Sequence, residues 1–206
     1  MPVGRVEAAD ENGQIAAVNG KSDAPLSELE GLLRTATGSG QAGARPVESW
    51  NPPYCGDIGL KIRHDGQWLY QESLIGRIAL VKLFASILRK DDDGRTYLVT
   101  PAEKIGVDVE DAHFLAVEMA VEGSGETQTL TFRTNVDDVV AVDKDHPLRF
   151  KRAEPDGGLK PYVLVRGHLE ALATRAVYAE LVALAEARDG GDTVGVWSGG
   201  VWWEMR

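Results

Sequence analysis

The sequence predicts an α+β fold made of two duplicated strand–strand–helix–strand modules with antiparallel sheets. Residues 58–100 and 148–205 follow one order: strand, Asp-Gly turn, strand, arginine, helix, Asp-Gly turn and strand. The predicted strands outnumber the helices, and they come in pairs joined by short turns, which is typical of antiparallel hairpins. Strands grouped in this way, rather than alternating with helices, favour the α+β class over the parallel α/β class.

Composition and local patterns divide the chain into three parts. Residues 1–45 are rich in Gly, Ala, Ser and Asp, which predicts a mobile arm. Within this arm, Ser27 and Glu30 have the spacing of a capping box beside a helical repeat of leucines, so we expect a short helix there. Residues 46–110 should form the first α+β module and residues 111–206 the second.

Glycine-rich turns separate pairs of strands at three places. In each pair, apolar and polar residues alternate, as they do in half-buried strands. The three predicted hairpins join 58–63 to 68–70, 114–122 to 127–134, and 196–198 to 201–203.

Each module is predicted to contain one helix, which begins directly after an arginine. In the first module, apolar residues at 78–88 cover more than half of the helix circumference, and Lys82, Ser86 and Arg89 share the remaining wedge. So wide an apolar arc indicates burial on two sides, by the sheet and by the neighbouring module. In the second module, a longer helix is expected after Arg166.

Bulk properties exclude several classes of protein. No hydrophobic run approaches the roughly 20 residues that a membrane helix needs, so no membrane span is expected. The single cysteine and the acidic start without an apolar signal segment favour a cytoplasmic location. A formal net charge of -10 argues against binding a long nucleic acid. Spacings typical of metal ligands and glycine-rich nucleotide motifs are missing, so no cofactor or metal is predicted.

Charge is unevenly distributed along the chain. Residues 61–90 carry a local charge of +4, whereas residues 108–145 carry -8. The basic stretch would suit a small anion, and the acidic stretch would suit a basic protein partner. The alternative for both stretches is ordinary solvated surface.

Two arginines are the first candidate ligand-binding residues. Arg77 and Arg166 stand at matching strand-to-helix junctions of the two predicted modules, and a cleft between docked modules is a favoured place for a small ligand. A guanidinium there can bind a phosphate or carboxylate through two hydrogen bonds. The alternative is a structural ion pair with Glu103, Asp108 or Asp111.

Cysteine and tryptophan offer weaker candidates. Cys55 would need a nearby base to act as a nucleophile, and none of the four histidines stands at a motif spacing from it. A packed thiol is the alternative. The five tryptophans could stack on a nucleobase, although a place in the core or in a cross-strand pair is their usual role.

Several short motifs together are similar to one known family. They are Trp50 to Asp57, Ile75 to Arg77, Leu98 to Lys104, Pro161 to Arg166 and Trp197 to Gly200. On these motifs, residues 50–200 resemble the bacterial domain of unknown function 1285 family. His113 stands where this resemblance leads us to expect proline.

The resemblance implies two related modules, the second loosely similar to pleckstrin-homology-like folds. It also implies an interdomain site for a nucleotide-like ligand and a suspected role in signalling. The matched positions at the module junction are Trp50, Cys55, Asp57, Arg77, Glu103, Asp111 and Arg166.

Three functions follow from these observations, in decreasing order of support. The first is a non-enzymatic module that binds a small anionic or nucleotide-like ligand between the modules and has a signalling or regulatory role. The second is an adaptor that meets a basic protein partner through strand edges and residues 108–145. The third is an enzyme that uses Cys55, or the carboxylates of Asp57, Glu103 and Asp111, in the same cleft.

Overall fold

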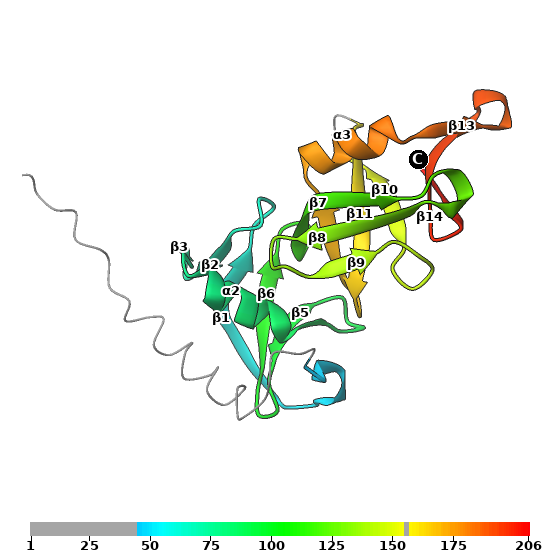
Figure 1. Ribbon diagram of the computed structural model, residues 1–206. Coiled ribbons are helices and arrows are strands. Elements are labelled where there is room, and N and C mark those ends of the chain that lie inside the picture. The colour runs from blue at the N-terminus through cyan, green and yellow to red at the C-terminus, as the bar shows by residue number, and fades with distance from the viewer. Residues whose placement is uncertain (1–44, 155–156) are drawn as a thin grey trace, which may run out of the picture. The chain divides into compact units, whose positions relative to one another are not determined.

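The computed structural model of the chain describes residues 45–154 and 157–206. The predicted arm and its short helix lie outside these residues, as does Asp156 of the expected turn in the second module. The described part contains three β-sheets and two α-helices (Figure 1). Neither helix is long and apolar enough to cross a membrane.

The first sheet has six strands in the order β3-β2-β1-β6-β5-β4. Strands β1 to β3 form one antiparallel meander and β4 to β6 form another, and the two meanders meet where β1 pairs with β6 in parallel. The helix α2 (Ile78–Ser86) connects the meanders. The strands are β1 (Tyr54–Ile62), β2 (Trp68–Tyr70), β3 (Ser73–Leu74), β4 (Leu88–Lys90), β5 (Thr96–Val99) and β6 (Lys104–Val109).

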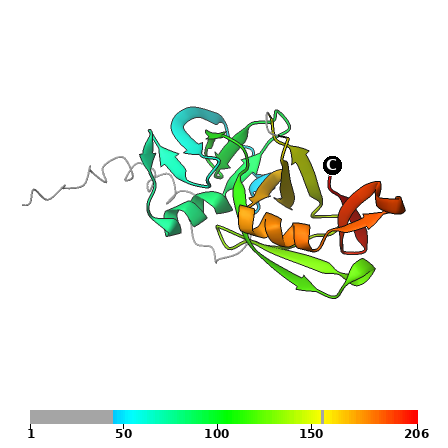
Figure 2. The same ribbon diagram turned by 90° about the horizontal axis from the view of Figure 1, so that it is seen from above.

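The second sheet repeats this plan with the order β10-β11-β12-β7-β8-β9. Again two antiparallel meanders meet where their first and last strands, β7 and β12, pair in parallel. The helix α3 (Arg175–Ala183) follows β12 and lies along β7 (Figure 2). The strands are β7 (Phe114–Glu122), β8 (Thr129–Thr134), β9 (Val139–Ala141), β10 (Leu148–Arg152), β11 (Leu159–Arg166) and β12 (Leu169–Ala173).

The two sheets have the same strand order, which supports a duplicated two-domain α+β fold. The predicted alignment of the repeats was wrong, because β1 to β6 correspond to β7 to β12 rather than 58–100 to 148–205. The expectation of antiparallel sheets was also too simple, since each six-stranded sheet contains one parallel pair. Turn residues indicate which neighbouring strands form hairpins, but they carry no information about pairing between the first and last strands.

A small third sheet closes the chain. It contains β13 (Glu186–Arg188), β14 (Thr193–Ser198) and β15 (Val201–Glu204) in sequence order. The hairpin of β14 and β15 is confirmed, as are those of β1 with β2 and β7 with β8. Short 3₁₀ turns are present at η1 (Val47–Ser49), η2 (Gly125–Thr127) and η3 (Asp189–Gly191).

Both helices differ from their predicted bounds. The apolar run after Arg77 ends as a helix at Ser86, because Leu88 pairs with Leu98 and continues as strand β4. Arg89 therefore belongs to a strand and is buried, not exposed on a polar wedge of the helix. In the second module, Leu169–Ala173 form strand β12 instead of the start of a helix.

Helix α3 begins later because Thr174 caps it. The Thr174 side chain accepts a hydrogen bond from the backbone N–H of Val177, and Val177 and Leu181 are fully buried. A threonine N-cap satisfies an amide that the helix itself leaves unpaired.

We therefore expect Thr174→Ala to lower the free energy of unfolding by about 1 kcal/mol. Equilibrium denaturation in urea would measure this loss. Thr174→Ser keeps the hydroxyl and should retain most of the stability. Equal losses in the two variants would contradict a capping role.

Candidate functional site

The contact between the two modules, called the seam here, joins β1–β6 with α2 to β7–β15 with α3. Arg166 Nη2 donates to the Ala85 carbonyl near the end of α2 (2.7 Å), and its Nη1 pairs with Asp138. Lys82 of α2 forms an ion pair with Asp137. These polar links fix α2 against the second six-stranded sheet.

A hollow of about 540 Å³ lies at the seam, and it is called the seam hollow below. Three segments line it: 48–51 ahead of β1, 89–93 in the β4–β5 hairpin, and 167–168 in the turn between β11 and β12. His168 Nδ1 donates to the Lys90 carbonyl across the seam (3.3 Å). Both modules therefore contribute to this hollow.

Arg89 organises one wall of the seam hollow. Its Nη1 donates to the carbonyls of Val47 and Trp50 (2.7 Å each), and its Nε and Nη2 pair with Asp91. Burial raises the pKa of Asp91, but hydrogen bonds and charges from Arg89 and Lys104 outweigh this and hold the pKa below 3.8. The segment that carries Trp50 is thereby tied to β4.

His113 is a buried residue that links the two modules. It is 4% exposed, and its Nδ1 accepts the backbone N–H of Glu170 (3.1 Å) while its Nε2 lies 3.1 Å from Thr96 Oγ1. An accepting Nδ1 places the proton on Nε2, so the ring is neutral and donates to Thr96. Burial, aided by the positive charges of Lys90 and Arg166, lowers the pKa of His113 to about 4.

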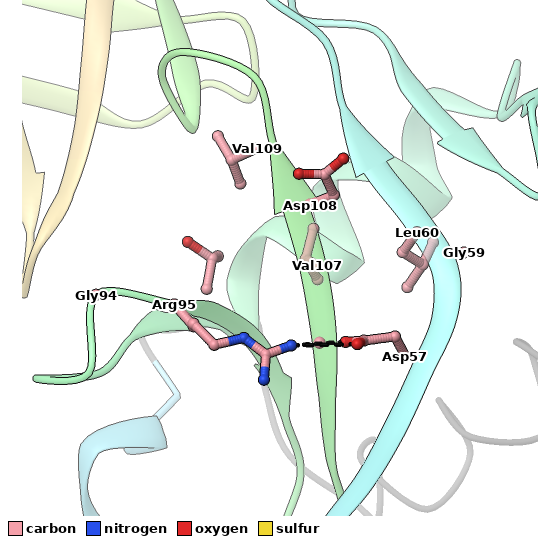
Figure 3. Close-up of a pocket in the computed structure, with 10 residues that line it drawn as sticks. Asp57, Gly59, Leu60, Gly94, Arg95, Val107, Asp108 and Val109 are labelled. Atoms are coloured by element: carbon pink, nitrogen blue, oxygen red, sulfur yellow. Dashed lines mark hydrogen bonds and ion pairs between the residues drawn. The ribbon is translucent and has the colours of Figure 1, made fainter.

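A second hollow, of about 480 Å³, lies on the face of the first sheet and is called the strand-face hollow. Figure 3 shows Arg95 and Asp57 meeting across β6, with Asp108 farther along that strand. Arg95 Nη2 donates to both carboxylate oxygens of Asp57 (3.0 and 3.2 Å). A Cβ atom at Gly106 would lie 1.7 Å from Asp57 Oδ1, so only glycine allows the carboxylate to lie there.

The two arginines predicted to share a cleft lie apart in the fold. Arg77 is the exposed residue that precedes α2, whereas Arg166 bonds to Ala85 near the other end of this helix. Arg166 is the last residue of β11 and is followed by a turn into β12, so placing it at a strand-to-helix junction was wrong. Its ion-pair partner is Asp138 rather than a residue between the modules.

The other predicted site residues are divided among several places. Trp50 lines the seam hollow and Asp57 lines the strand-face hollow. Cys55 is exposed on β1, which contradicts the packed-thiol interpretation, and its Sγ lies 3.5 Å from the Pro53 carbonyl. Glu103 is half-buried in the turn before β6. Asp111 accepts hydrogen bonds from Lys160 Nζ and Tyr162 Oη of β11 (2.7 Å each).

Sequence reasoning missed most residues that line the two hollows. Arg89 was assigned to a helix, and Asp91 was not among the predicted site residues. Their only local signal is an arginine two residues before an aspartate at the end of an apolar run, which fits many unrelated surfaces. Among residues 45–154 and 157–206, no group of three or more His, Cys, Asp and Glu side chains is arranged to hold a metal ion.

Two family models match successive parts of the chain. Residues 45–112 match the N-terminal domain of the domain of unknown function DUF1285, and residues 113–205 match the C-terminal domain of the same family. No curated protein matches the chain.

Two solved structures are similar to this protein. A DUF1285 family protein from Silicibacter pomeroyi DSS-3 is 42% identical with a TM-score of 0.78, and the match covers 84% of this chain and 93% of that chain. A DUF1285 family protein from Shewanella baltica OS155 is 27% identical with a TM-score of 0.48, over 61% of this chain and 91% of that chain.

Fold and seam together define a two-domain α+β protein whose modules repeat one strand order. The chain belongs to the DUF1285 family, which confirms the resemblance of its motifs.

Proposed function

We propose that this protein binds a small anionic, nucleotide-like ligand in the seam hollow, as a ligand-binding protein with a signalling or regulatory role. The observation that carries the proposal is a hollow lined by both modules, in which a buried arginine fixes the segment bearing Trp50. A ligand held there would contact both modules at once. Clefts between modules are favoured ligand sites for this reason.

Four carboxylates line the seam hollow, those of Glu48, Asp91, Asp92 and Asp93, and ion pairs neutralise the charge of Asp91. Asp91 pairs with Arg89 and Lys104. Asp93 accepts hydrogen bonds from Tyr97 Oη (2.6 Å) and the backbone N–H of Arg95. Lys90 then supplies a cationic donor for a phosphate or carboxylate, and Trp50 supplies an aromatic ring for a base.

A panel of nucleoside mono- and diphosphates, cyclic nucleotides and inorganic phosphate should contain a compound that raises Tm. A ligand present at 100 times its Kd stabilises a protein by about 2.7 kcal/mol. Trp50→Ala and Lys90→Ala should each weaken this stabilisation. Differential scanning fluorimetry and titration calorimetry measure both effects.

Two control variants test whether the rise in Tm comes from a ligand in the seam hollow. Lys144→Ala changes an exposed lysine outside the seam hollow and should keep the full shift in Tm. Arg77→Ala should also keep it, because Arg77 does not line this hollow. A panel that leaves Tm unchanged, or a shift that survives both Trp50→Ala and Lys90→Ala, would rule out the proposal.

The adaptor function is the second candidate, and the edge strand β9 favours it. Val139 is 65% exposed on this edge, within the acidic stretch 108–145. However, several acidic side chains of this stretch already form ion pairs: Asp111, Glu118, Asp137 and Asp138. Binding of a basic partner should therefore be weak and should fade as salt rises.

The enzyme hypothesis has the least support from the geometry. Asp57 pairs with Arg95. Burial raises the pKa of Asp111, but hydrogen bonds from Lys160 and Tyr162 outweigh it and hold the pKa below 3.8. A carboxylic acid with a lowered pKa is a poor proton donor near neutral pH.

A further inference from the structure

We propose that the strand-face hollow is a second ligand site, which binds a small zwitterion of the amino-acid class. In this arrangement Arg95 takes the carboxylate of the ligand, and Asp57 and Asp108 take its ammonium group. This site is separate from the seam hollow and does not depend on the function proposed there.

The guanidinium of Arg95 is held in place by aromatic rings. Its Cζ lies 5.4 Å from the ring centroid of Tyr54 and 5.5 Å from that of Tyr97, and these two rings meet edge to face. These two neighbouring rings restrict the side chain and reduce the entropy that a ligand must overcome.

Arg95 still has hydrogen-bonding capacity. Its side-chain hydrogen bonds to Asp57 and Tyr54 all come from Nη2. Within the described residues, Nε and Nη1 are left with no protein acceptor. Each of these N–H groups can donate a single hydrogen bond to a carboxylate oxygen.

Two carboxylates face solvent in the same hollow. The side chains of Asp57 and Asp108 are 62% and 70% exposed, and Lys61 lies 3.7 Å from Asp108. Exposed ion pairs contribute little to stability, so the fold does not need Asp57 to stay on Arg95. Gly106 leaves room for the Asp57 carboxylate, and the register of β1 against β6 shifts on both sides of Asp57.

The mixture of charges selects among ligands. A simple anion would be attracted by Arg95 but repelled by Asp57 and Asp108. A simple cation would be attracted by the two carboxylates but repelled by Arg95. A molecule with both charges satisfies both groups. The hollow of about 480 Å³ is also within the range of small-ligand pockets.

The test is titration calorimetry of the full chain with ω-amino acids of increasing length, from glycine to 6-aminohexanoate. Acetate and ethylamine, at equal ionic strength, serve as controls that carry one charge each. We expect one length to bind, because only one separation of charges can match Arg95 and Asp108. The single-charge controls should bind at least about tenfold more weakly.

Matched variants test whether the amino acid binds in the strand-face hollow. Arg95→Gln and Asp108→Asn should each weaken the best amino acid about tenfold or more, while Asp145→Asn, an exposed change elsewhere, should leave it unchanged. Trp50→Ala should also leave it unchanged, which separates this site from the seam hollow. The proposal is overturned if no amino acid binds, if acetate binds equally well, or if Asp108→Asn has no effect.

Discussion

Replacing Arg89 with methionine should destabilise the protein by about 3 kcal/mol, the cost of breaking a buried charge pair by removing one partner. Its side chain is 10% exposed, and the change leaves Asp91 with Lys104 alone. The carbonyls of Val47 and Trp50 would also lose their shared donor. Methionine fills a similar volume, so the loss should come from the missing polar contacts rather than from a cavity.

Equilibrium unfolding in urea measures this loss, and the same hairpin provides a matched control. Arg95→Gln removes another arginine–aspartate pair, but this pair is exposed and should contribute little. Arg89→Met should also weaken any ligand of the seam hollow, since the Trp50 segment is no longer tied to β4. Equal stabilities for the two variants would contradict a structural role for Arg89.

The protein should lose stability in mild acid because of His113. The folded protein keeps this imidazole neutral down to about pH 4, whereas the unfolded chain binds a proton near pH 6.5. The unfolded state therefore binds more protons in this interval, and the free energy of unfolding should fall as pH falls from 6.5 to 4. Over this interval the free energy of unfolding should fall by about 3 kcal/mol.

Denaturation curves at intervals between pH 7.5 and pH 4 would show this dependence. His113→Asn keeps a neutral acceptor for the N–H of Glu170 and removes the titratable ring, so its stability should change much less over this range. The pKa values of Asp91 and Asp111 are lowered, so these carboxylates should matter only in stronger acid. A wild-type profile as flat as that of the variant would refute the assignment.

The local features of the fold could be predicted, whereas its long-range pairings could not. Hairpins around Asp65-Gly66 and Gly199-Gly200 were predicted correctly because glycine-rich turns and alternating strands are adjacent in the sequence. The parallel pairs of β1 with β6 and β7 with β12 have no local signal. Strand β12 was mistaken for helix because Leu169 to Ala173 have good helix propensity, which the neighbouring strands override.

The candidate site was predicted only in outline. Trp50 lies in a hollow between the modules, as the resemblance implied, but Arg77 and Arg166 do not share it. Arg89 shows why the lining of the seam hollow was not predicted. A charged residue in an apolar run is usually expected to be exposed. Its burial depends on carbonyl groups of Val47 and Trp50, some forty residues earlier in the chain.

The strand order also has a consequence for synthesis on the ribosome. In each six-stranded sheet the first strand cannot form its parallel pairing until the last strand has been synthesised. Leu60 pairs with Val107, and Phe114 pairs with Ala171. Neither central ladder can close until nearly the whole module has emerged, and such distant contacts slow folding. Until then the inner edges of the nascent meanders are unprotected, which makes this stage the one at which the growing chain is most exposed to aggregation.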